Sequence, residues 1–105
     1  MDLQDNARAL DLEIDEYLEL LRLFLKTSSS NLTDLNNAVH RNDEKAVSSV
    51  AHKIKGAALN LNLSDVARHA KTLETSARGG SLEGAASLCR QLETAVDDVA
   101  GLIED

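Results

Sequence analysis

Apolar residues recur every three to four positions through most of this 105-residue chain, and no proline interrupts the pattern. This spacing lines the apolar side chains along one stripe of an α-helix, and such a stripe must be buried against another element. No segment shows the alternation of β-branched and polar residues that is typical of strands. The sequence therefore predicts an all-α fold.

Four main helices joined by short turns are predicted. The first begins between Asp11 and Asp15 and continues for about 25 residues, unless the weak helix formers at positions 27–30 kink it. The second begins at Asn42 or Asp43, which are both good helix caps, and ends near Asn62. The stretch before residue 11 has room for a short additional helix.

Ser64 is expected to cap the third helix, and the glycine pair at 79–80 is expected to end it. The last helix is expected over residues 82–103. Short connections favour antiparallel neighbours, so we predict an up-down four-helix bundle in a single domain, residues 1–105. The predicted core stripes are Ile14, Leu18, Leu21, Leu25, Leu32, Leu35 and Val39; Val47, Val50, Ala51, Ile54, Ala58 and Leu61; Val66, Ala70, Leu73 and Ala77; and Leu82, Ala85, Cys89, Leu92, Val96, Val99 and Ile103.

Composition excludes several classes of protein. A net charge of -7 opposes binding to nucleic acid phosphates, and one Phe and one Tyr provide no platform for stacked bases. A single cysteine excludes a disulfide framework. The apolar runs are too short to span a membrane, and the N-terminus does not resemble a signal peptide. We therefore expect a reduced, cytoplasmic protein that binds neither membrane nor nucleic acid.

The second predicted helix carries a polar face centred on His52. At 100° per residue, His52 points about 140° away from the core stripe, and Lys55 follows three residues later on the same side. Gly56 costs a helix about 1 kcal/mol relative to alanine, and it removes a side chain where another molecule could approach. A neutral imidazole has a free ring nitrogen, so this face could carry a phosphoryl acceptor, although an ordinary exposed histidine beside surface lysines also fits.

The other candidate residues favour structural roles. His40 lies at the end of the first helix, where a cation complements the helix dipole, and His69 lies on the flank of the third core stripe. Cys89 occupies a core position. No histidine follows a glutamate by three residues, as a carboxylate-bridged metal site would need, and no bound metal or cofactor is expected.

Residues 51–58, Ala-His-Lys-Ile-Lys-Gly-Ala-Ala, resemble the signature of histidine-containing phosphotransfer (HPt) domains, which is Ala-His-x-Leu-Lys-Gly followed by small residues. The similarity in the order and length of the helices extends along nearly the whole chain. The resemblance implies a four-helix bundle that accepts a phosphoryl group from the aspartyl phosphate of one receiver domain and transfers it to an aspartate of another.

The resemblance also assigns roles to individual residues. It implies that His52 is the phosphorylated residue, that Lys55 helps to hold the phosphoryl oxygens, and that Gly56 allows the receiver to dock closely. Glu74 matches a position where the family often has Glu or Gln, which could orient the imidazole through a hydrogen bond.

Two positions depart from the family pattern. Asn62 replaces the glycine that the family commonly has ten residues after the histidine, and asparagine is the next-best residue for a left-handed turn. Leu59 replaces a small residue and could either contact a partner or restrict which receivers dock. Neither departure removes a residue that the chemistry needs.

The charge is distributed unevenly along the chain. Residues 1–40 hold eight acidic and three basic residues, residues 41–71 hold three and six, and residues 72–105 hold seven and two. The basic middle would favour the approach of a receiver's acidic pocket. The expected partners are receiver domains and a hybrid sensor histidine kinase, with Mg²⁺ held by the receiver. The expected docking residues are Lys45, Ser48, Ser49, Lys53 and Leu59.

The resulting hypothesis is a monomeric phosphoryl carrier without kinase activity of its own, whose transfer is completed by the receiver. A helical adaptor that binds receivers or kinases without being phosphorylated is the first alternative. An acyl carrier would need Asp-Ser-Leu at a helix start, whereas this chain has Ser64-Asp65-Val66. The phosphoacceptor domain of a chemotaxis-type kinase is a third possibility, and the initiating methionine favours a stand-alone protein instead.

Overall fold

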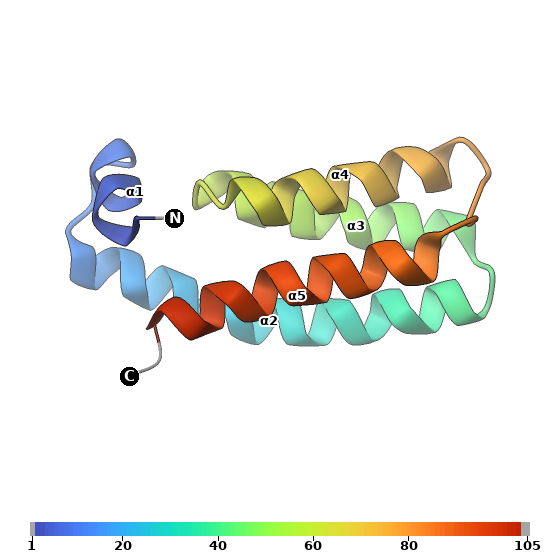
Figure 1. Cartoon of the computed structure of the whole chain (residues 1–105), viewed down its shortest axis with the longest axis horizontal. Helices are drawn as coiled ribbons and strands as arrows, with labels where there is room; N and C mark the ends of the chain where they lie inside the picture. The colour runs from blue at the N-terminus through green and yellow to red at the C-terminus, as the bar shows by residue number, and fades with distance from the viewer. Residues whose placement is uncertain (1, 104–105) are drawn as a thin grey trace.

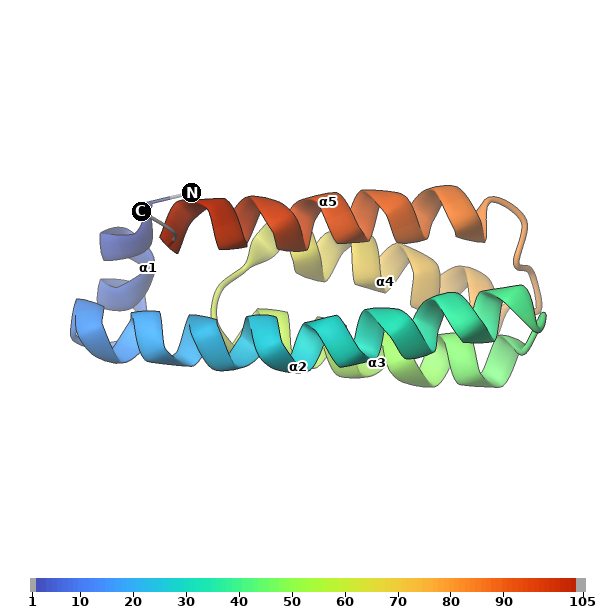
Figure 2. The same cartoon turned by 90° about the horizontal axis from the view of Figure 1, so that it is seen from below.

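The computed structural model describes residues 2–103, and this part of the chain forms five α-helices and no strand. Helices α2 to α5 lie side by side and run alternately up and down, whereas α1 packs across the free end of α2 (Figures 1 and 2). The predicted all-α up-down four-helix bundle, with a short additional N-terminal helix, is confirmed. The helices are α1 (Leu3–Ala9), α2 (Ile14–His40), α3 (Glu44–Asn60), α4 (Ser64–Arg78) and α5 (Ala85–Ile103).

Asp and Asn residues shape the turns that separate the helices. Asp11, Asn42 and Asn62 all adopt left-handed backbone conformations, with φ between 56° and 60°. Asn and Asp tolerate this conformation better than other residues with a side chain. Asp43 then caps α3 by accepting a hydrogen bond of 3.1 Å from the backbone N–H of Ala46. Of the two residues predicted to begin this helix, Asn42 therefore makes the turn and Asp43 makes the cap.

The structure decides three points about the predicted helices α2, α4 and α5. Helix α2 runs without interruption through residues 27–30, and Ser28 is buried within it. Ser64 does not cap α4: the buried Leu63 occupies the cap position, and no side chain bonds there. Helix α5 begins at Ala85 rather than at Leu82, because Gly84, at φ 73°, still belongs to the turn.

The inward face of α2 is rotated relative to the prediction. Tyr17, Phe24 and Ala38 are buried although none was placed in the stripe. The predicted stripe, which Ser28 also fits, contributes Leu21, Ser28 and Leu35 to the fully buried set, while its other members are partly buried at the edges of the core. Nearly every residue from 17 to 25 is apolar, so the pattern allowed more than one stripe.

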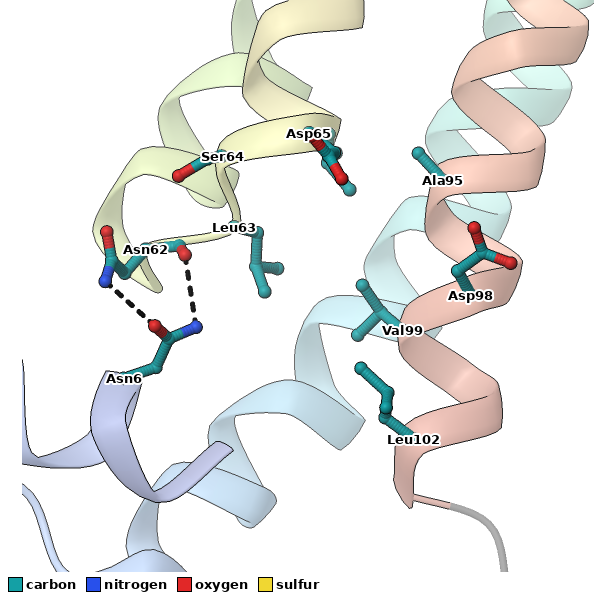
Figure 3. Close-up of a pocket in the computed structure, with 10 residues that line it drawn as sticks. Asn6, Asn62, Leu63, Ser64, Asp65, Ala95, Asp98, Val99 and Leu102 are labelled. Atoms are coloured by element: carbon teal, nitrogen blue, oxygen red, sulfur yellow. Dashed lines mark hydrogen bonds between the residues drawn. The ribbon is translucent and has the colours of Figure 1, made fainter. Parts of the chain in front are cut away.

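Helix α1 is tied to the turn between α3 and α4 by neutral hydrogen bonds. The Asn6 amide donates to the backbone oxygen of Asn62 at 3.2 Å and accepts from the Asn62 side chain at 3.0 Å (Figure 3). The buried Tyr17 hydroxyl donates to the backbone oxygen of Leu61 at 2.6 Å and accepts from Asn6. These contacts hold α1 and α2 against the turn that joins α3 to α4.

No helix within residues 2–103 combines the length and the apolar character that crossing a membrane requires.

Candidate functional site

The candidate site lies where α3 and α4 pack together, the most extensive helix contact in the bundle. His52 stands in the middle of α3, with 59% of its side chain exposed. Its neighbours Ala51 and Ile54 are fully buried, which holds the opposite face of the helix in the core. The predicted orientation of His52, away from the core, is what the structure has.

The carboxylate of Glu74, on α4, faces this histidine. Only 3% of the Glu74 side chain is exposed, and its Oε2 atom lies 2.7 Å from the Nδ1 atom of His52. Its Oε1 atom accepts a hydrogen bond of 2.6 Å from the ammonium of Lys55. The guanidinium of Arg78, one turn further along α4, lies 3.2 Å from Oε2. One buried acid therefore holds three side chains from two helices.

The surroundings of Glu74 keep it ionised. The hydrogen bond from Lys55 lowers the pKa of this carboxyl from its usual value of 4.5, burial opposes the change, and the hydrogen bond to His52 and the charges of Lys55 and Arg78 lower it further. An ionised carboxylate can only accept hydrogen bonds. Nδ1 of His52 is therefore the protonated ring nitrogen, and Nε2 of the neutral ring carries the free lone pair.

Gly56 leaves an open space one turn after His52. A Cβ atom added to this glycine would meet no other atom within 4 Å. Packing within the chain therefore does not require a glycine here, although alanine would favour the helix by about 1 kcal/mol. Leu59 follows with 60% of its surface exposed. This part of α3 therefore offers an open, partly apolar surface beside the imidazole.

An open hollow flanks His52 on the side of the preceding turns of α3. Four of the five expected docking residues line it: Lys45, Ser48, Ser49 and Lys53. Glu44, Ala77 and Arg78 complete the lining. Leu59 does not line this hollow, so the expected docking residues fall on both sides of the imidazole.

The remaining histidines lie elsewhere. His69 lines a groove between α4 and α5, and His40 is exposed in the last turn of α2. Cys89 is buried, and burial raises the pKa of its thiol to about 11, so it is a poor nucleophile. Within the described part of the chain, His, Cys, Asp and Glu side chains do not gather in threes as a metal ion would need.

Arg78 is the residue of this site that the sequence reasoning missed. It follows Glu74 by four residues, a spacing that places two helical side chains on the same face. This spacing can be read from the sequence, but by itself it predicts only an ion pair on the surface. The burial of Glu74 is visible only in the structure.

Comparison with known proteins identifies the family. The family model described as Hpt domain matches residues 19–101, and the chain belongs to this family. It is therefore a histidine phosphotransfer domain of the kind that works in two-component phosphorelays, and the resemblance found in the sequence is confirmed.

A solved structure supports the same assignment. The bundle is similar to the crystal structure of histidine-containing phosphotransfer protein B (HptB) from Pseudomonas aeruginosa PAO1, with a TM-score of 0.87 and 33% sequence identity. The match covers 98% of this chain and 90% of that chain. The comparison with curated proteins found no match.

Proposed function

We propose that His52 accepts a phosphoryl group from the aspartyl phosphate of one receiver domain and transfers it to an aspartate of another. One observation carries this proposal: an exposed imidazole whose Nδ1 atom is held by a buried carboxylate at 2.7 Å, which leaves Nε2 free towards solvent. A histidine that served only as surface would not need a buried acid behind it.

The transfer step needs no external base, because the attacking nitrogen carries no proton. The Nε2 lone pair attacks phosphorus in line, the new N–P bond forms as the P–O bond to the receiver's aspartate breaks, and the bond pair leaves with that carboxylate. Because Nδ1 keeps its proton, the phosphorylated ring becomes an imidazolium. Forward transfer is the reverse: an aspartate oxygen attacks phosphorus, and the N–P bond pair returns to Nε2.

Glu74 and Lys55 support the charges that this step creates. The Glu74 carboxylate lies against the Nδ1–H group, where positive charge develops on the ring. The ammonium of Lys55 has three donors, one of which is bound to Glu74, so it can also donate to a phosphoryl oxygen. In this proposal Glu74 orients the ring and Lys55 holds the phosphoryl group.

The partner supplies what the chain lacks. Mg²⁺ and the acidic pocket that binds it would belong to the receiver, and the chain would have no kinase activity of its own. Gly56 would let the receiver approach the imidazole, and Leu59 would provide an apolar contact. The lysines at 45 and 53 would meet the acidic pocket, which favours rapid and salt-sensitive encounter with receivers or with a hybrid sensor kinase.

A transfer assay tests the proposal. A phosphorylated receiver is mixed with the wild-type chain, with His52→Gln, and with the control variant His69→Gln, which removes a histidine outside the site. The wild type and the control should acquire acid-labile phosphate, and His52→Gln should acquire none. Phosphate on His52→Gln would contradict the proposal, and a wild type that binds the receiver without being phosphorylated would instead indicate an adaptor.

A further inference from the structure

Arg78 reaches the buried carboxylate from an exposed position. Its side chain is 66% exposed, yet its Nη2 atom lies 3.2 Å from Glu74 Oε2, the same oxygen that accepts from His52. Arg78 also lines the hollow beside the imidazole. No other arginine within residues 2–103 is bound to this carboxylate.

The charges at the site explain why a second cation is needed. Before phosphorylation, Lys55 alone would balance the charge of Glu74. A phosphoryl group adds about two negative charges close to that carboxylate, of which the imidazolium offsets one, and its oxygens compete for the Lys55 ammonium. A buried carboxylate that loses the Lys55 ammonium would then depend on the Nδ1–H group and on Arg78 for its pairing, while the phosphoryl group repels it.

We propose that Arg78 is a positioning residue that keeps Glu74 paired, and so keeps the Nδ1–H group of His52 oriented, while Lys55 binds the phosphoryl oxygens. This inference rests on the proposed function of His52. It assigns the two cations different roles: Lys55 acts on the phosphoryl group, and Arg78 acts only through Glu74.

Arg68 provides a matched control on the same helix. Its side chain is 65% exposed and lies 3.5 Å from Asp65, three residues earlier, but that acid is itself 82% exposed. The two arginines therefore have the same charge and exposure, and they differ in whether their acid is buried beside His52. A lower phosphorylation rate after substitution of either arginine would indicate an effect of net charge. A lower rate after substitution of Arg78 alone would indicate an effect on the pairing of Glu74.

The first experiment measures phosphorylation of the full chain by phosphoramidate, a small P–N phosphodonor that requires no docking surface, and by a saturating phosphorylated receiver. Arg78→Gln should slow both reactions about fivefold, Arg78→Lys should restore most of the rate, and Arg68→Gln should match the wild type. A loss confined to low receiver concentration would mean that Arg78 serves docking, and would overturn the proposal. Wild-type melting temperatures would show that the variants are folded.

The second experiment is a double-mutant cycle with Glu74→Gln. If Arg78 acts through Glu74, then Arg78→Gln should have no further effect once Glu74 is neutral. Additive losses, or equal rates for Arg78→Gln and Arg68→Gln, would overturn the proposal. If His52 were not the acceptor, the wild type itself would be phosphorylated elsewhere or not at all, so failure of the proposed function is distinguishable from failure of this inference.

Discussion

Two regions of the molecule form polar contacts with the α3–α4 pair, and they do so differently. At the turn between the helices, Tyr17 and Asn6 satisfy backbone oxygens through neutral hydrogen bonds. Opposite the middle of α3, the buried Glu74 of α4 carries a full charge and is bound by three side chains that reach towards solvent. Neutral hydrogen bonds are sufficient to hold the helices in place. Burying a charge lowers stability unless it is well paired, so a buried charge beside an exposed histidine indicates a functional role.

The difference predicts that the two regions respond to mutation in opposite ways. Changes at the turn should alter stability and leave phosphoryl transfer intact. Changes around Glu74 should alter transfer more than stability, because its cations can reach water when the acid is lost.

Within this comparison, the largest effect is expected for Glu74→Ala. Loss of the acceptor for Nδ1–H frees the imidazole to rotate and to change tautomer, so phosphorylation by phosphoramidate should slow by about 10- to 100-fold. Glu74→Gln retains an acceptor oxygen, so its phosphorylation rate should fall far less. The rate of phosphate incorporation is measured for both variants. A Glu74→Ala variant that is phosphorylated as fast as the wild type would contradict the role of Glu74 in orienting the imidazole.

Tyr17→Phe should give the converse result. It removes the hydrogen bond of 2.6 Å to the backbone oxygen of Leu61, which should lower the free energy of unfolding by about 1–3 kcal/mol. Transfer at a temperature where the variant is folded should be unchanged. Urea denaturation followed by circular dichroism measures the first quantity, and a slower transfer would show that the two regions are coupled.

Gly56→Ala should change stability and function in opposite directions. Because the new methyl group meets nothing within 4 Å, the free energy of unfolding should rise by about 0.5–1 kcal/mol. Transfer from a receiver should slow, while phosphorylation by phosphoramidate should not. Gly101→Ala is the control: this glycine also lies in a helix with open space around it, and its substitution should leave both reactions unchanged.

The smallest effect is the dependence of stability on pH. The pKa of Glu74 is lowered in the folded chain, so its contribution is complete above the usual value of 4.5 and is lost as the pH falls through the lowered value. Across that interval the wild type should therefore lose more unfolding free energy than Glu74→Gln. Asp65→Asn, which removes an exposed acid, should show the same pH dependence as the wild type. If the unfolding free energy of all three proteins changed with pH in the same way, the pKa of Glu74 would not be lowered by its surroundings.

The limits and the buried face of a helix could be predicted from the sequence where the helix has a single apolar stripe. Helix α3 carries one, and its predicted limits lie within about two residues of the observed ones, the usual uncertainty of a helix end. Helix α2 is apolar over most of its first three turns, so its periodicity could not select Tyr17 and Phe24 over Leu18 and Leu25. There the choice is made by packing against the neighbouring helices.

The site divides in the same way. The arrangement of His52, Lys55 and Gly56 follows from their spacing on one helix, so helix geometry alone predicts it. Glu74 lies 22 residues from His52 on another helix, and only the resemblance to a family placed it near the imidazole. Its ion pair with Arg78 follows from their spacing of four residues on α4, whereas its burial depends on how α4 packs on α3, which no local pattern encodes.

The central claim is that Nε2 of His52 carries the phosphoryl group. The most direct measurement is ³¹P and ¹⁵N NMR of the phosphorylated, ¹⁵N-histidine-labelled chain at alkaline pH, where phosphohistidine is stable. A single ³¹P resonance coupled to Nε2 of His52 is the predicted result. A phosphoryl group on Nδ1, on His40 or on His69 would contradict the claim.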